Sequence, residues 1–193
     1  MRSMVEGAPT QMRRRGGPLH HRLAAAVPLP VPGRSDVALR PGPLYSRPVS
    51  STLYSRDILR LAASIPHLGR LEAPHGAAER TSKVCGSRVT VDVALDGEGR
   101  IAALGLEVKA CALGQASAAL LGAEALGQSE AQLAGARDAL AAYLRGERDD
   151  PGAWPGLAVF AAAQTYAARH AAILLPFEAA AAAVADALAR AAA

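Results

Sequence analysis

The sequence contains little cysteine and few aromatic residues. Of its 193 residues, two are cysteine, and phenylalanine, tryptophan and tyrosine together make up 4%. Two cysteines exclude a small fold held together by several disulfides. Although 51% of the residues are hydrophobic, the apolar excess is alanine. No run of about eighteen strongly apolar residues occurs, so we expect no transmembrane helix and no membrane partner.

The sequence also lacks the short motifs of common enzyme classes. It has no glycine-rich phosphate loop, no Ser-His-Asp order and no HExxH pattern. These motifs supply the phosphate-binding backbone, the activated nucleophile or the zinc ligands of the corresponding enzymes. Hydrolase and nucleotide-binding functions therefore have no support in the sequence, and the family resemblance described below implies a binding and carrier protein rather than an enzyme.

The positive charge is confined to one part of the chain. The formal net charge is +4, but residues 1–50 hold eight arginines against Glu6 and Asp36, which gives +6. Residues 51–193 hold 13 basic and 15 acidic side chains, which gives −2. A basic protein often binds nucleic acid. Because the basic residues belong to one segment, we expect no nucleic-acid partner for the rest of the chain.

Residues 1–50 also carry eight of the 13 prolines. Proline prevents regular helix, so we predict a disordered leader over 1–50 and a folded domain over 51–193. Three other interpretations remain open for the leader. Arg13–Arg15 with the apolar stretch after it resembles an export signal, although Pro28 interrupts that stretch. The segment also resembles a basic arm for nucleic acid, or an extension upstream of a start at Met12.

The clearest local pattern predicts a β-hairpin. In Arg88–Leu95, four apolar residues alternate with Arg88, Thr90, Asp92 and Ala94, which is the period of a half-buried strand. The Asp-Gly-Glu-Gly sequence that follows is typical of a turn. A second alternating segment covers Ala102–Ala110. We therefore predict an antiparallel hairpin at about residues 87–110 with one buried face.

Helical patterns surround this hairpin. Each has a capping residue or a stop signal, such as Ser55, Ser129 with Gln132, or Gly127. Four helical segments are predicted, namely Asp57–Ser64, Leu113–Leu126, Glu130–Leu144, and Leu157–Ala193 split in two by Pro176; His67–Lys83 is predicted to be a loop. Trp154 and Phe160 are expected in the core. The fold class is therefore α+β, with helices on one face of a small antiparallel sheet.

The two cysteines lie at corresponding ends of the predicted hairpin. Cys85 precedes the first strand and Cys111 follows the second, so the two thiols should lie side by side although they are 26 positions apart. Cys111 also precedes a helix, whose dipole favours a thiolate. Two converging thiols suggest metal or sulfur chemistry. The alternative is that each cysteine is a small buried hydrophobic residue.

Four segments in this order resemble the iron–sulfur cluster assembly scaffold family, the group of IscU, SufU and the N-terminal domain of NifU. The resemblance covers Leu53 to about Ala189. It rests on an opening helix and three ligand motifs, found here as Leu53–Leu59, Val84–Val89, Ala110–Ser117 and Tyr166–Ala172. The spacing between the second and third motifs resembles that of SufU.

The resemblance implies a function and partners. A scaffold of this family receives iron and persulfide sulfur, assembles a [2Fe–2S] cluster and passes it to acceptor proteins. In SufU-like members a zinc ion occupies the same ligands, and the protein accepts sulfur from a cysteine desulfurase. The resemblance further implies a cytoplasmic protein that can form a homodimer. Three cysteine thiolates and an aspartate ordinarily serve as the ligands.

The sequence departs from the family at two of these four ligands. Ser87 stands in place of the aspartate and Ala172 in place of the third cysteine, so only Cys85 and Cys111 carry over as cluster or metal ligands. His170 is the candidate replacement, since imidazole also binds zinc and iron. In a helix it would point about 200° away from residue 172.

Two alternatives follow from these departures. One is a scaffold-derived interaction protein that no longer binds metal and keeps no cofactor. The other is a zinc-type sulfur acceptor, with a persulfide on Cys111 or Cys85. The absence of the third cysteine, the family's usual sulfur acceptor, counts against the second.

Overall fold

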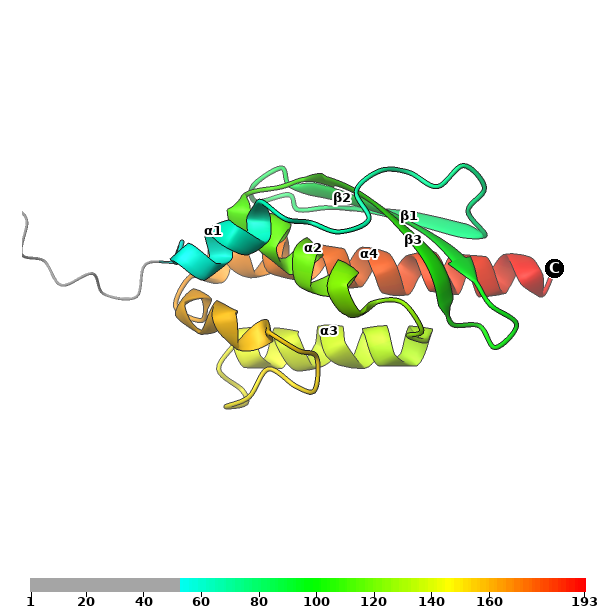
Figure 1. The fold of residues 1–193 in the computed structure, drawn as a ribbon. Helices are drawn as coiled ribbons and strands as arrows, with labels where there is room; N and C mark the ends of the chain where they lie inside the picture. The colour runs from blue at the N-terminus through cyan, green and yellow to red at the C-terminus, as the bar shows by residue number, and fades with distance from the viewer. Residues whose placement is uncertain (1–52) are drawn as a thin grey trace, which may run out of the picture. The chain divides into compact units, whose positions relative to one another are not determined.

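The computed structural model describes residues 53–193, and the predicted leader lies outside them. These residues form an α+β fold, as expected (Figure 1). Its elements, in chain order, are α1 (Arg56–Ala62), β1 (Gly76–Thr81), β2 (Arg88–Leu95), β3 (Ile101–Lys109), α2 (Ala112–Glu124), α3 (Glu130–Leu144), the short 3₁₀ helix η1 (Leu157–Ala163) and α4 (Ala167–Ala191).

The predicted hairpin is confirmed as β2 and β3. The strands pair antiparallel, with Val89 opposite Val108, Val91 opposite Leu106 and Val93 opposite Leu104. The three valines and Leu106 are fully buried. Because side chains alternate between the faces of a sheet, this register puts one apolar row on the face that the helices cover.

The prediction of a loop over His67–Lys83 is wrong, because Gly76–Thr81 forms β1 at the edge of the sheet. The strand order is β1-β2-β3, with every pair antiparallel. The sequence of β1 begins with glycine and two alanines and ends with polar residues. It therefore lacks the alternation of apolar and polar residues that marks a strand. Tertiary packing decides it: a Cβ on Gly76 would collide with the backbone of α4 at Ala183, and the Ala77 amide donates to Asp186 of α4 at 3.1 Å.

The middle of the hairpin is also buried on its second face, at Thr90 and Asp92, where one buried face was predicted. Asp92 is 0% exposed and its carboxylate accepts from Arg70, with a distance of 2.8 Å to one guanidinium nitrogen. The segment before β1 crosses this face. It pairs with the outer edge of β3 at Leu106, and it passes so close to Gly105 that a Cβ there would lie 2.8 Å from the Gly69 carbonyl oxygen. This crossing segment covers the middle of the polar row at Asp92, whereas Arg88 at its start stays exposed.

The helices form two further layers under the sheet (Figure 1). Helices α2 and α4 pack on the sheet and on each other, and α3 packs on α4. The predicted bounds of α3 are confirmed, and its capping box forms between Ser129 and Gln132. Trp154 and Phe160 are buried in the core, as expected; the rings of Trp154 and Phe177 meet edge to face, with centroids 5.2 Å apart.

The prediction that Pro176 divides the last helical segment is wrong. The break falls between η1 and α4, and α4 runs through Pro176 without interruption. A proline inside a helix removes the hydrogen bond to the carbonyl four residues earlier, here that of Ala172. Pro176 is itself buried, and α4 contacts the sheet, α2 and α3, so tertiary packing offsets this loss.

Helix α4 is long and apolar enough to span a membrane by length and composition alone. Its 18-residue window has a mean hydropathy of 1.7, and 61% of that window is buried inside the protein. A buried helix of this kind is also what the core of a globular domain contains. The many alanines of α4 contribute to its high mean hydropathy. Their small side chains also let α4 approach its neighbours closely.

Candidate functional site

Cys85 lies in the six-residue loop Ser82–Ser87 that joins β1 to β2. The loop is closed by two backbone hydrogen bonds, from the Ser82 amide to the Ser87 carbonyl at 2.8 Å and from the Gly86 amide to the Ser82 carbonyl at 2.9 Å. Gly86 has a φ of +68°, a left-handed conformation that glycine adopts at little cost. This tight turn holds the Cys85 side chain at the end of the strands.

Cys111 is the N-cap residue of α2, directly after β3. Because Arg88 at the start of β2 pairs with Lys109 at the end of β3, the two cysteines lie at the same end of the sheet. The predicted convergence of the thiols is therefore confirmed. Both thiols are free and partly exposed. We call this surface, formed by the Ser82–Ser87 loop, Cys111 and the first turn of α4, the cysteine edge.

The Ser87 hydroxyl connects the two cysteines. The Cys85 thiol donates to Ser87 Oγ at 3.1 Å, and the backbone amide of Cys111 donates to the same oxygen at 3.5 Å. Ser87 itself is 4% exposed. The residue in place of the family's aspartate thus ties the β1–β2 loop to the start of α2.

The surroundings of Cys85 favour its thiolate. The Ser82 hydroxyl and the Ser87 hydroxyl lower the pKa of the Cys85 thiol below its ordinary value, and the positive charge of Arg169 acts in the same direction. Partial burial opposes them. Ser82 is buried, and its oxygen forms no hydrogen bond of full geometry with the residues that the structure describes. It therefore has no strong competing partner.

Ala172 is buried in α4 and lies against the first turn of α2. A Cβ on Gly114 would lie 3.0 Å from the Ala172 carbonyl oxygen, and the Ser117 hydroxyl donates to the carbonyl of the next residue, Ile173, at 2.6 Å. Helix α2 begins at Cys111, so α4 brings residue 172 close to the cysteine edge. The alanine side chain offers no donor atom there.

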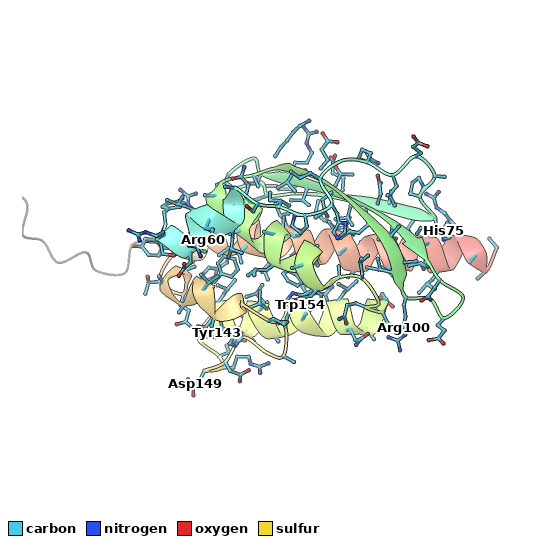
Figure 2. The ribbon with its side chains drawn as sticks, in the orientation of Figure 1. Arg60, His75, Arg100, Tyr143, Asp149 and Trp154 are labelled. Atoms are coloured by element: carbon cyan, nitrogen blue, oxygen red, sulfur yellow. The ribbon has the colours of Figure 1, made fainter. Side chains whose placement is uncertain are left out.

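Within residues 53–193, no histidine joins the two thiols in a group that can hold a metal ion. His170 lies one turn into α4, where its Nε2 atom is 2.9 Å from the Ala163 carbonyl oxygen of η1. His75 accepts from the Leu95 amide at 2.9 Å, at the far end of β2, and Figure 2 shows it beside the C-terminal part of α4. His170 as a metal ligand stays a prediction.

The donors of one chain do not complete a metal site. Within residues 53–193, no three His, Cys, Asp or Glu side chains form a group that can hold a metal ion. Tetrahedral zinc and [2Fe–2S] sites ordinarily use four protein ligands. The cysteine edge supplies two, and the Ser87 hydroxyl between them is already hydrogen-bonded.

Sequence reasoning missed three features of the site. These are the position of Ser82, the hydrogen bonds of Ser87, which the sequence shows only as a departure from the family's aspartate, and the position of Arg169 near Cys85. The Ser-x-x-Cys-x-Ser spacing does not reveal that the Ser87 hydroxyl contacts the Cys85 thiol, because this depends on the turn at Gly86. Arg169 is 84 positions from Cys85, and only the packing of α4 brings them near.

Comparisons with known proteins connect this arrangement to a family. No family model and no curated protein matches the sequence. Among solved structures, the chain is similar to the N-terminal part of a nitrogen-fixing NifU-like protein from Brucella abortus, with 34% identity, 71% of this chain and 95% of that chain covered, and a TM-score of 0.67. A protein of Fervidobacterium islandicum, described as an iron–sulfur cluster assembly scaffold for the SUF system, shares the fold; identity is 23%, coverage 70% and 98%, and TM-score 0.64.

The fold and site together define an α+β domain with two free cysteines at one end of a three-stranded antiparallel sheet. The chain belongs to the NifU-like, IscU- and SufU-related family of iron–sulfur cluster assembly scaffold proteins. The resemblance seen in its motifs is thereby confirmed. Within that family its cysteine edge has two thiols, a serine and an alanine at the four ligand positions.

Proposed function

We propose that this protein is a scaffold and carrier in iron–sulfur cluster assembly, and not an enzyme. Its cargo is iron or a [2Fe–2S] cluster, held through Cys85 and Cys111 and passed to acceptor proteins, with a cysteine desulfurase as the source of sulfur. We place it in the cytoplasm, where thiols such as these two stay reduced. Family membership supports the scaffold role, and the placement of both cysteines around the Ser87 hydroxyl carries the proposal.

The chemistry of the edge suits a soft metal cargo. Thiolates bind iron–sulfur clusters and zinc strongly, and the hydroxyls of Ser82 and Ser87 lower the pKa of the Cys85 thiol, which favours the thiolate form. Zinc is the other metal that these donors fit. Since one chain supplies two strong donors, His170 or groups from another molecule must complete the site.

A second candidate function is a scaffold-derived interaction protein that binds no metal. The observation that favours it is the loss of two ligands in a chain that keeps the fold and buries Ala172 completely. Such a protein would retain a surface for the desulfurase or for other assembly proteins.

Metal analysis separates the two candidates. The full-length protein is purified without oxygen and assayed for iron, zinc and acid-labile sulfide per chain. It is compared with the Cys85→Ala, Cys111→Ala double variant and with Ser64→Ala, which changes an exposed residue of the described region. A scaffold retains metal in proportion to protein, and the double variant loses at least nine-tenths of it while Ser64→Ala loses none.

Reconstitution gives the same test independently of purification. Ferrous iron and sulfide are added to the apoprotein, and the visible absorption of a [2Fe–2S] cluster is followed. A folded wild-type protein that takes up no iron, zinc or cluster in either assay contradicts the scaffold proposal and favours the metal-free interaction protein. Circular dichroism of each variant establishes that it is folded.

A further inference from the structure

The two cysteines of the chain lie close to each other at the cysteine edge. Strands β2 and β3 end with Arg88 opposite Lys109, and each cysteine lies just beyond this pair. The Cys85 thiol and the backbone amide of Cys111 are hydrogen-bonded to the same oxygen, Ser87 Oγ, at 3.1 and 3.5 Å. A disulfide bridges Cα atoms that are about 4.4–6.8 Å apart, which is the spacing of neighbouring residues on paired strands. A bond between the two sulfurs therefore needs only a local adjustment.

The two side chains are free to make that adjustment. Cys111 is the N-cap of α2, and its side chain makes no capping hydrogen bond that rotation would break. Cys85 lies in the loop between β1 and β2, beside Gly86, whose added Cβ would have nothing within 4 Å. The backbone of Cys111 is held, because α2 begins there and the residue packs against the core. The loop is thus the part that moves, and the hydrogen bond from the Cys85 thiol to Ser87 is given up.

Both thiols can be reached from solvent, because each cysteine is partly exposed. Cys85 has the more open surroundings. Val84 and Gly86 on either side of it are exposed, whereas Cys111 packs against the core. An accessible cysteine next to a second cysteine that can resolve it is the arrangement found in redox-sensing thiols. Disulfides of cytosolic proteins are mostly of this transient kind.

We propose that Cys85 and Cys111 form a reversible disulfide within one chain, driven by a small-molecule disulfide such as oxidised glutathione. The Cys85 thiolate attacks one sulfur of that disulfide, whose S–S bond breaks and releases one glutathione thiolate. The Cys111 thiolate then attacks the Cys85 sulfur of the mixed disulfide and releases the other. Two protein thiols are oxidised, one glutathione disulfide is reduced to two glutathione molecules, and these take up the two cysteine protons. Excess dithiothreitol reverses the oxidation.

The disulfide acts as a switch on cargo uptake, a consequence that rests on the proposed function. Thiolates, and not disulfide sulfurs, are the ligands of zinc and of iron–sulfur clusters. Oxidation therefore removes both strong donors of the cysteine edge in one step, and reduction restores them. The bond itself needs no metal, so its formation is measured separately from cargo binding.

Mass spectrometry of the full-length protein tests the disulfide. Reduced protein is incubated with chelator and oxidised glutathione, and the remaining thiols are blocked with N-ethylmaleimide in acid. The expected product is a monomer that is lighter than the reduced chain by two hydrogen atoms and carries no maleimide. Trypsin should then release residues 84–88 linked to residues 110–137, and dithiothreitol should separate them.

Variants assign the order of the two steps. Cys111→Ser is expected to stop at the mixed disulfide and to carry one glutathione on Cys85. Cys85→Ser is expected to acquire glutathione at least tenfold more slowly, because the remaining thiol packs against the core. Ser64→Ala, at an exposed position, is the control and should form the internal disulfide at the wild-type rate. Zinc uptake per chain should fall at least tenfold on oxidation and recover with dithiothreitol.

The outcomes distinguish this inference from the proposed function. Glutathione on both cysteines without an internal bond, or disulfides between chains, overturn the inference and leave the scaffold function standing. So does a disulfide that forms no more readily in the folded protein than in protein unfolded by urea. An internal disulfide in a protein whose reduced form takes up no zinc, iron or cluster supports the inference and overturns the scaffold function.

Discussion

A single hydroxyl oxygen organises the cysteine edge. Ser87 Oγ accepts from the Cys85 thiol and from the Cys111 amide, although these residues belong to different elements. A serine is a poor metal ligand at neutral pH. Once Cys85 loses its proton, however, the Ser87 hydroxyl can donate to the thiolate and stabilise its charge. The serine in place of the family's aspartate is therefore a weaker ligand, but its hydroxyl still lowers the pKa of the Cys85 thiol.

The reactivity of Cys85 is expected to depend on these hydroxyls. In a Cys111→Ala background and with chelator present, the rate of alkylation by iodoacetamide should rise to half its maximum at a lower pH than for cysteine in an unstructured peptide. The reason is that the Ser82 and Ser87 hydroxyls and Arg169 lower the pKa of the Cys85 thiol. Ser82→Ala and Ser87→Ala should each move this midpoint to higher pH.

The same shift has a consequence for stability. Because the folded-state pKa is lowered, the thiolate adds stability at pH values above the ordinary thiol pKa, and this contribution is lost as pH falls through the lowered value.

Ser64→Ala, which removes an exposed hydroxyl at the end of α1, is the matched control for the alkylation experiment and should not move the alkylation midpoint. A wild-type midpoint at or above that of the peptide would contradict the assignment.

At the scale of elements, the contact between α2 and α4 positions the cysteine edge. Gly114 lies where α2 passes α4, and an added Cβ would meet the Ala110 Cβ at 2.8 Å and the Ala172 carbonyl oxygen at 3.0 Å. Both neighbours are held by backbone and cannot swing aside. The absence of a side chain at Gly114 thus allows Cys111 and residue 172 to lie near each other.

Gly114→Ala is expected to destabilise the fold although alanine is the better helix former. Overpacking of this kind costs about 1–3 kcal/mol, more than the gain of about 0.5–1 kcal/mol from helix propensity. Gly135→Ala in α3 is the matched control, because nothing lies within 4 Å of its added Cβ, and it should stabilise by about that smaller amount.

Urea unfolding followed by fluorescence measures both variants, since the chain has one tryptophan and Trp154 is buried. Equal changes in the free energy of unfolding for the two variants would show that the close approach at Gly114 does not constrain the fold. A destabilised Gly114→Ala protein should also show altered alkylation of Cys111, because α2 begins there.

At the scale of the whole molecule, the described residues form one hydrophobic core built from the sheet and the helices. Residues 53–193 bury a continuous core that includes Val91, Leu121, Phe160 and Phe177. Zinc-finger domains, by contrast, obtain most of their folding free energy from the ion. The cysteine edge lies at one end of the sheet, where the partly buried Cys111 packs against this core.

Removal of metal is therefore expected to leave the fold intact. Protein dialysed against a chelator should keep its helical circular dichroism and unfold cooperatively. Added Zn²⁺ should raise Tm only by the linkage that binding to the folded state provides. The double variant Cys85→Ala, Cys111→Ala should show no such rise. Loss of secondary structure on chelation alone would mean that metal is part of the fold.

Much of this architecture is readable from local pattern. The alternation in Arg88–Leu95, the capping box at Ser129 and the motifs around Cys85 and Cys111 predict a hairpin, a helix and a family, because each depends on residues close together in the chain. The hairpin geometry also predicts that the thiols share one end of the sheet. Because these features depend on neighbouring residues, tertiary packing does not override them here.

Only the tertiary structure decided the remainder. Strand β1 forms because it pairs with β2 and packs on α4. Helix α4 continues through Pro176 because it packs against the sheet, α2 and α3. The buried Asp92 carboxylate is paired with Arg70 of the segment that crosses the sheet. The sequence by itself determined the fold class, the position of the two thiols and the loss of two ligands. That Ser82, Ser87 and Arg169 act on one thiol follows from contacts between segments far apart in the chain, which no local pattern encodes.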